Sequence, residues 1–294
     1  MADTTAVDLR TTLGAAELPR DVLRVAGPEA VDYLQGQLSQ DVAGLAAGAS
    51  AWSFLLQPTG KVDAWLRVTR TGDDAFVLDV DAGYGEAVVA RLRRFLLRTK
   101  AEVDMLPWRA VALRGPGADR VDGLAGLVVA TWPGVAGVDV LGEDAAVPAG
   151  VERATAADLA SLRVRAGIPA MGAELSEATI PAEAGRHVVD ASVSFTKGCY
   201  TGQELVARID SRGGNVPRRV RGLVLPDTAG VAPGAAVVVD GDEVGRVTSV
   251  APAPGGGAVA LALVKRAVEP PARGEVRAAD GTVAAEVVTV PFQA

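Results

Sequence analysis

The octapeptide Lys197-Gly198-Cys199-Tyr200-Thr201-Gly202-Gln203-Glu204 contains the only cysteine of the chain, and the only histidine, His187, lies upstream of it. A lysine ammonium two residues before a thiol favours the thiolate. The two glycines let the backbone approach a ligand closely. Taken alone, the octapeptide predicts a site for a polar ligand beside a single reactive thiol.

An arginine cluster follows the octapeptide and suits an anion. Its members are Arg208, Arg212, Arg218, Arg219 and Arg221. For the last three, a solvated loop between domains explains the charges equally well, so the residues alone leave both interpretations open.

Composition bounds the class of protein. The 294 residues are 49% apolar and 22% charged, which is typical of a globular chain with one large domain or two ordinary ones. The net charge of -7 argues against a general nucleic-acid binder. One cysteine and one histidine exclude an internal disulfide and argue against a zinc site, so we expect no metal site. The polar N-terminus and the lack of a membrane-length apolar run predict a soluble cytoplasmic protein without membrane contact.

Hydrophobic periodicity predicts an α+β fold for the first two thirds of the chain. A first strand is expected at 22–26. The strands expected at 51–57, 62–69 and 75–80 form an antiparallel meander with turns at Gly and Pro. Helices are expected after Gly27-Pro28, ending at Gly36, and over 85–98 and 155–166. Residues 111–118 repeat the strand, Gly-Pro and helix-start order of 22–30, which hints at duplication, and further strands are expected at 127–131 and 135–141.

The chain changes character near Pro217. Beyond it, alternating strands at 220–225, 235–239, 245–250, 259–264 and 283–290 predict a small antiparallel barrel, with hairpin turns at Gly241-Asp242 and Asp280-Gly281. The sequence therefore predicts an α+β region over residues 1–216 and a β-barrel domain over 217–294.

Cys199 has four possible interpretations. A catalytic Cys–His pair would need His187, and no spacing places that ring beside the thiol. A phosphate-binding loop is disfavoured because its glycine-lysine pattern is missing. A plain buried cysteine and a thiol close to a ligand, which transiently engages a metal, cluster or electrophile, both remain open.

The octapeptide resembles the K-G-C-[FY]-x-G-Q-E signature of the YgfZ-type folate-binding family, which is related to the aminomethyltransferase (T-protein) of glycine cleavage. Further segments match in the expected order, so that the resemblance covers nearly the whole chain from about residue 20. These segments are Gly27-Pro28-Glu29-Ala30, Gln35-Gly36-Gln37 with Asp41, Gly60-Lys61, Arg163 through Pro169, and Ser194-Phe195.

The resemblance implies an aminomethyltransferase-like fold closed by a C-terminal antiparallel β-barrel. It also implies a tetrahydrofolate-binding accessory protein that supports iron–sulfur cluster assembly or repair in client enzymes, such as radical enzymes that modify tRNA. Its partners would be tetrahydrofolate and, transiently, the iron–sulfur client enzymes, with no direct binding of nucleic acid. Folate would lie in a central channel with Lys197 and Cys199 at or near its wall.

The resemblance also suggests roles for single residues. Cys199 would be the nucleophile or transient cluster ligand, and Lys197 would favour its thiolate. Gln203 and Glu204 would fix the loop or meet the folate, and the downstream arginines would hold its glutamyl carboxylates. The residues expected to contact folate are Lys197, Gly198, Tyr200, Gly202, Gln203, Glu204, Arg208, Arg163 and Arg20.

Two positions depart from the aminomethyltransferase pattern. Val135 stands where a carboxylate would meet the pterin amino group, and Val88 stands where an aspartate would assist aminomethyl transfer. An apolar side chain cannot move a proton or stabilise an iminium. We therefore expect no conventional enzyme, with a folate-dependent one-carbon transferase as the first alternative and an interaction module with a vestigial pocket as the second.

Overall fold

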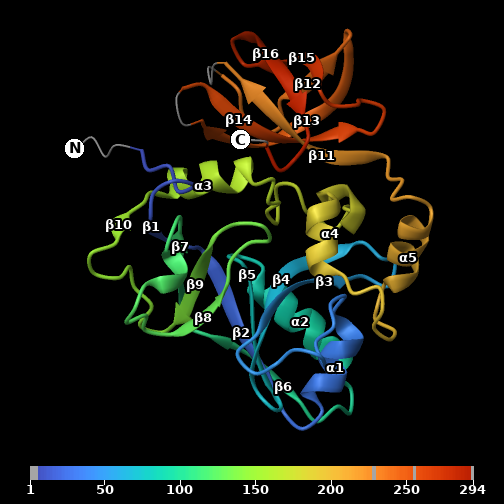
Figure 1. The fold of residues 1–294 in the computed structure, drawn as a ribbon. Coiled ribbons are helices and arrows are strands. Elements are labelled where there is room, and N and C mark those ends of the chain that lie inside the picture. The colour runs from blue at the N-terminus through green and yellow to red at the C-terminus, as the bar shows by residue number, and fades with distance from the viewer. Residues whose placement is uncertain (1–5, 227–229, 254–255, 293–294) are drawn as a thin grey trace.

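The computed structural model describes residues 6–226, 230–253 and 256–292. Three units surround the centre of the molecule: two α+β units, and a C-terminal barrel that lies across one end of both (Figure 1). The predicted α+β fold with a C-terminal antiparallel barrel is confirmed.

The first unit is built on an antiparallel sheet in the order β3-β4-β5-β2-β6. The predicted meander is its β3-β4-β5 part. Two helices accompany the sheet, and Gly36 lies inside the first of them instead of ending it, because its φ is not left-handed and the helix continues to Gln37. The elements are β2 (Arg20–Ala26), α1 (Ala30–Gln37), β3 (Ser50–Leu56), β4 (Val62–Gly72), β5 (Ala75–Asp81), α2 (Gly85–Leu96) and β6 (Glu102–Leu106).

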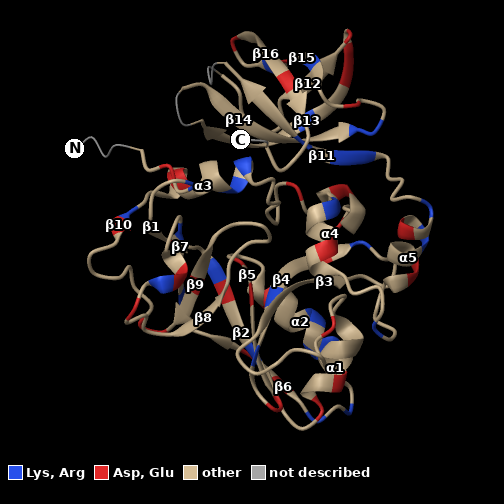
Figure 2. Ribbon diagram, in the orientation of Figure 1, with Lys and Arg blue, Asp and Glu red and all other residues tan. Residues whose placement is uncertain are grey.

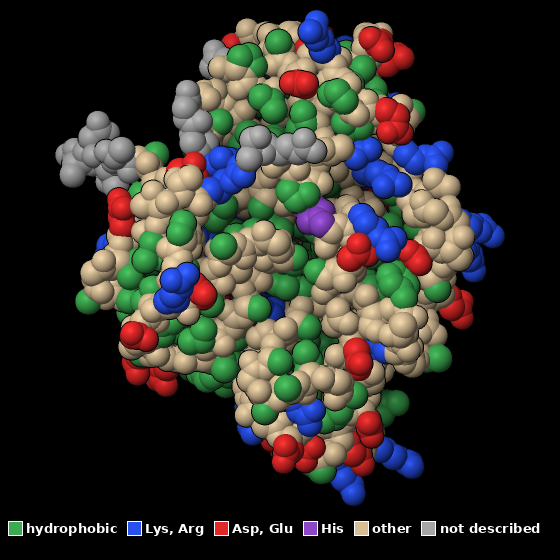
Figure 3. All heavy atoms as spheres, in the orientation of Figure 1, with side chains coloured by type: hydrophobic (Ala, Val, Ile, Leu, Met, Phe, Trp, Pro, Cys, Tyr) green, Lys and Arg blue, Asp and Glu red, His purple; other side chains and the backbone are tan. Residues whose placement is uncertain are grey.

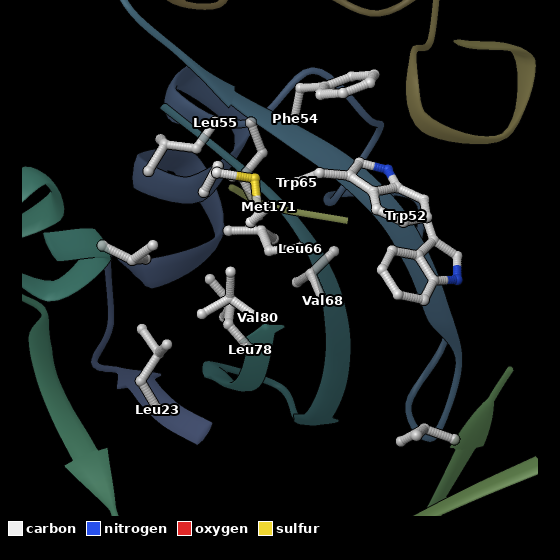
Figure 4. Packing of buried hydrophobic residues seen from close by; sticks show 14 of the residues in the cluster. Leu23, Trp52, Phe54, Leu55, Trp65, Leu66, Val68, Leu78, Val80 and Met171 are labelled. Carbon is white, nitrogen blue, oxygen red and sulfur yellow. The ribbon is translucent and has the colours of Figure 1, made fainter. Parts of the chain in front are cut away.

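The largest apolar core belongs to this unit. Trp52 and Trp65 stack with their ring centroids 4.1 Å apart, and the Met171 side chain reaches the same cluster from a distant segment (Figure 4). On α2, Val88 and Leu92 point into the core, as the helical spacing predicts. This packing holds the sheet against segments that come from later in the chain.

The second unit has the sheet order β10-β1-β7-β9-β8. Its β7 is followed by Gly115-Pro116-Gly117, but only one 3-10 turn succeeds it where the first unit has an eight-residue helix, so the suggested repeat is partial. The elements are β1 (Gly14–Glu17), β7 (Arg109–Arg114), η1 (Ala118–Arg120), β8 (Leu127–Ala130), β9 (Gly137–Gly142) and β10 (Glu152–Arg153).

A chain of buried charges joins the two sheets. Asp79 accepts from Arg67 and from Arg20, at 2.7–2.9 Å. Arg67 also donates to Asp139 at 2.6 Å, and Asp139 accepts from Arg114 at 2.6 Å. Because these five side chains are almost fully buried, the units are held together by interactions that depend on each partner staying charged.

Helices between the sheets and the barrel complete the first two thirds of the chain. The first begins with the predicted capping box, in which Thr155 and Asp158 satisfy each other's backbone amides. The sequence patterns did not predict the last two α-helices, which are short. The elements are α3 (Ala156–Arg165), η2 (Pro181–Ala184), α4 (Arg186–Ser192) and α5 (Gln203–Ser211).

The barrel is closed and antiparallel, in the order β11-β14-β13-β12-β15-β16. The first hairpin turns at Asp240-Gly241, both with positive φ, which is one residue earlier than expected. The fifth strand escaped prediction because Arg273, Glu275 and Arg277 leave it few apolar positions. The strands are β11 (Arg218–Leu225), β12 (Ala236–Val239), β13 (Asp242–Pro252), β14 (Ala258–Lys265), β15 (Ala272–Ala278) and β16 (Gly281–Val288).

Candidate functional site

The octapeptide forms a loop over residues 197–202 and the first turn of α5. Gly202 precedes the helix with φ 82°, a left-handed conformation that favours glycine. A Cβ at this position would lie 2.5 Å from the Gln57 carbonyl oxygen, and one at Gly60 would lie 2.5 Å from the Leu205 Cβ. The loop therefore packs backbone to backbone against the β3–β4 turn, and both glycines are needed for that approach.

The Lys197 ammonium anchors the loop from inside. Its Nζ donates to the carbonyl oxygens of Gln35, Leu38 and Gln40 at 2.6, 2.7 and 3.0 Å. An ammonium has three donors, so none remains for a hydrogen bond to Cys199. Burial lowers the pKa of Lys197 to about 8, against the opposing effect of Asp41. The structure thus gives Lys197 a positioning role that the thiolate argument from the sequence did not include.

Backbone bonds join the same two segments on either side of Lys197. The Thr201 amide donates to the Gly36 carbonyl at 3.0 Å, and the Ser194 amide donates to the Ser39 carbonyl at 3.0 Å. The Ser39 hydroxyl donates to the Ser192 carbonyl at 2.6 Å. The loop is consequently fixed along its length to residues 36–40.

Cys199 is exposed at the outside of this fixed loop, and its thiol is free. Gln203 turns its carboxamide oxygen back to the Tyr200 amide at 3.2 Å, which is the loop-fixing role expected of it. Tyr200 is half-buried against the core, where burial raises its pKa to about 12, and Glu204 is exposed. The loop therefore presents a thiol to solvent from a rigid base, and the plain buried cysteine is excluded.

Replacing Lys197 by methionine is expected to free the loop, because three carbonyls lose their donor. Hydrogen bonds to a charged group contribute about 1.5–3 kcal/mol each when buried, and this ammonium is only partly buried, so we expect a loss of about 2 kcal/mol in the free energy of unfolding. Amide hydrogen exchange should accelerate at residues 196–204. Unchanged exchange there would contradict the anchoring role; Lys61→Met, which removes an exposed lysine, is the control.

Three predicted folate contacts lie outside the loop. Arg20 is buried and pairs with Asp79 and Asp81. Arg163 donates to Glu174 and Ser249, which joins α3 to the barrel. Both guanidiniums are thus engaged by protein groups, and no contact among the described residues joins them to the octapeptide. Arg208 is exposed on α5.

His187 does not pair with the thiol. Its Nε2 lies 3.1 Å from the Gly167 carbonyl oxygen, and burial lowers its pKa. Over the described residues, no group of three or more His, Cys, Asp or Glu side chains is arranged to hold a metal ion. No described helix combines the length and the apolar character of a membrane span.

The two valines that depart from the aminomethyltransferase pattern have different surroundings. Val135 lines a hollow of about 240 Å³ between the second sheet, α3 and the C-terminal segment, whose charged lining residues are Arg10 and Arg165. Val88 is buried on α2 against the core. The octapeptide contributes no lining residue to this hollow. At the centre of the face in Figure 3 the molecular surface is also hollowed.

Several residues of this site received no role from the sequence. Gln35 binds Asp41 through its amide nitrogen, while its oxygen accepts from the amide of Val42, so the pair closes the segment on which Lys197 is anchored. Arg67 and Asp139, whose ion pair joins the two sheets, were also not predicted to have a role. The available signal was a charged residue at a core-facing position of an apolar strand, which indicates a buried partner.

Comparisons with known proteins agree with this architecture. Residues 218–293 match the family described as glycine cleavage T-protein C-terminal barrel domain. The crystal structure of glycine cleavage system aminomethyltransferase T from Bartonella henselae superposes with a TM-score of 0.77 over 97% of this chain and 88% of that one, at 23% identity. The chain thus has the aminomethyltransferase fold.

Two relatives narrow the assignment. The tRNA-modifying protein YgfZ of Edwardsiella ictaluri is 27% identical over 69% of this chain and 71% of its own length. The mitochondrial iron-sulfur cluster assembly factor IBA57 of Homo sapiens is 30% identical over 92% of this chain and 82% of its own length. The chain therefore belongs to the YgfZ and IBA57 family, which shares its fold with the aminomethyltransferases.

Proposed function

We propose that this protein is a tetrahydrofolate-binding accessory protein that supports iron–sulfur cluster assembly or repair in client enzymes, with Cys199 as the group that engages the cluster. The observation that carries the proposal is the exposed thiol on a loop held by Lys197 and by backbone bonds to residues 36–40. A thiolate is the usual ligand of an iron–sulfur cluster. The relationship to the assembly factor IBA57 supports the same function.

Ligand counting limits what Cys199 does alone. Most iron–sulfur clusters use four protein ligands, and this chain has one cysteine. A cluster that meets Cys199 must therefore keep its other ligands on the client. The thiol acts as a transient ligand at an interface, and the rigid loop keeps it exposed for that encounter.

The hollow beside Val135 suits a folate. Leu9, Val135 and Phe292 give it apolar walls for a pterin ring. Arg10 and Arg165 line the same hollow and are cations of the kind that bind carboxylates, and Arg165 already pairs with Asp8 at 2.9 Å. Tetrahydrofolate, when bound, would supply the one-carbon chemistry; these residues would orient it and shield its ring from water.

Aminomethyl transfer is the second candidate, because the fold is shared with aminomethyltransferase T. The side chains present oppose it. Val88 is buried in α2 and Val135 lines the hollow without a carboxylate. Neither can exchange a proton with a substrate.

The decisive experiment uses a deletion strain complemented with variants. Cys199→Ala should abolish rescue of a cluster-dependent tRNA-modifying enzyme, measured as modified nucleoside in total tRNA, while Thr196→Ala, a change at an exposed neighbour on the same loop, should rescue fully. Full rescue by Cys199→Ala would refute the role of the thiol.

Calorimetry with tetrahydrofolate tests the proposed folate site. Binding should be weakened by Arg165→Met and unchanged by Arg94→Met, a change at an exposed arginine on α2.

A further inference from the structure

An apolar groove runs between η2, α4 and α5, next to the loop of residues 197–202, which we call the signature loop. Its volume is about 50 Å³, and Val189, Val206 and Ile209 line it. Phe195, only two residues before Lys197, forms part of the wall and is 44% exposed, one of few large apolar side chains so exposed among the described residues. The groove thus offers an unfilled apolar surface on the loop and helix that carry the thiol.

A basic hollow adjoins this groove. It measures about 370 Å³ and is lined by Arg219, Arg221 and Arg266, with Glu269 as its one carboxylate. Arg219 lines the groove as well, so the two hollows are neighbours that share this side chain. Basic side chains gather on this face between the barrel and α5 (Figures 2 and 3). We call the groove and the hollow together the docking face.

Arg219, Arg221 and Arg266 of the docking face are poorly neutralised, whereas Arg186, at the groove, pairs with Asp190 and Asp210. Arg219 donates to the Gly214 carbonyl and Arg266 to the Asn215 side chain, neither of which is charged. Arg221 is half-buried, has no ion pair with a described residue, and has its pKa lowered by burial and then by Arg219, against Glu269. In the basic hollow, Arg219, Arg221 and Arg266 face a single carboxylate. The three cations therefore repel one another, and an incoming anion relieves that repulsion.

The combination defines the occupant. A small anion would use the arginines and leave the groove empty, whereas an apolar ligand would leave the arginines unneutralised. A protein segment with an apolar anchor and flanking carboxylates uses both. A second copy of this chain is disfavoured by its net charge of -7, which makes copies repel.

We propose that the docking face binds an acidic, apolar-anchored segment of the client protein and thereby brings the client beside Cys199. The inference rests on the proposed function for the identity of the partner. The geometry of approach follows from the chain itself: α5 begins within the octapeptide and carries Val206 and Ile209 into the groove.

The test uses a fluorescein-labelled dodecapeptide with leucine and phenylalanine on one helical face and glutamate on the other, measured by fluorescence anisotropy on the full chain. Saturable binding is expected, weakening as salt is added. The Arg219→Glu/Arg221→Glu variant should bind at least tenfold more weakly, and so should Ile209→Ser. Arg94→Glu/Arg98→Glu, an equal change of charge at two exposed sites on and just after α2, should bind normally. Circular dichroism verifies that each variant is folded.

Three results would overturn the inference. One is equal binding by the arginine double variant, and another is equal binding of a peptide with lysine in place of glutamate. The third is a peptide with serine in place of its apolar residues binding as tightly, which would reduce the face to a site for small polyanions. Because the assay contains neither folate nor a cluster, a failure here leaves the Cys199 rescue experiment untouched, and a failed rescue leaves peptide binding to be judged alone.

Discussion

Replacing Asp139 by asparagine is expected to lower the free energy of unfolding by about 3–5 kcal/mol, the usual cost of removing one partner from a buried ion pair. Asp139 lies between Arg67 and Arg114, and all three side chains are at most 1% exposed. Without its charge, two guanidiniums remain buried with too little compensation, and Arg114 already has two buried nitrogens without a described hydrogen-bond partner. Urea unfolding with constant m-value measures the loss.

The matched control is Asp104→Asn. Asp104 forms an ion pair with Arg93 in which both side chains are more than half exposed, and such pairs contribute at most about 1 kcal/mol. A second variant separates charge from packing: Arg114→Met in the Asp139→Asn background should recover part of the lost stability, because it removes an uncompensated cation. Equal small losses for Asp139→Asn and Asp104→Asn would show that the charge chain does not join the two units.

The same cluster predicts a dependence of stability on pH. Burial acts to raise the pKa of Asp139, but Arg114 and Arg67 together outweigh it, so the folded pKa lies below the ordinary 3.8. A carboxyl with a depressed folded pKa stabilises the native state above its unfolded pKa, and that contribution disappears as pH falls through the folded value. The stability lost below about pH 4 should be smaller in Asp139→Asn than in the unmodified chain, as urea titrations between pH 2 and 7 would show.

Replacing Gly202 by alanine is expected to displace the signature loop and to cost about 2–3 kcal/mol of stability. The left-handed conformation costs about 1 kcal/mol for a residue with a Cβ, and the clash with backbone adds to it. The new methyl would lie 2.5 Å from the Gln57 carbonyl oxygen, in a turn that cannot move freely because Gly60 approaches from the same side. Rescue of the client enzyme should fall with it.

Gly198 offers the control within the same octapeptide. Its Cβ position faces open space and its φ is not left-handed, so Gly198→Ala should keep both stability and rescue. The order of the loop can be followed by the rate at which Cys199 reacts with a thiol reagent. This rate should differ from that of the unmodified chain only in Gly202→Ala. Identical behaviour of the two alanine variants would show that close packing against the β3–β4 turn is unimportant.

The local patterns of this chain were sufficient for most elements. The period of the apolar residues located α2 and the β3-β4-β5 meander, and Thr155 with Asp158 marked the start of α3. Helices α4 and α5 escaped because each spans at most nine residues, too few for a periodic pattern to emerge from glycine-rich surroundings. The octapeptide identified the family without any coordinates, since its spacing is rarer than any periodicity.

What the sequence alone determined is the fold class, the barrel and the one thiol that chemistry can use, because these depend on local periodicity and on counting. Only the tertiary structure decided which charges meet. It directed the Lys197 ammonium to three carbonyls of residues 35–40, engaged Arg20 and Arg163 with carboxylates, and gathered Arg219, Arg221 and Arg266 around one hollow. Such pairings join residues as much as 162 positions apart, and long-range contacts leave no periodic trace in either segment.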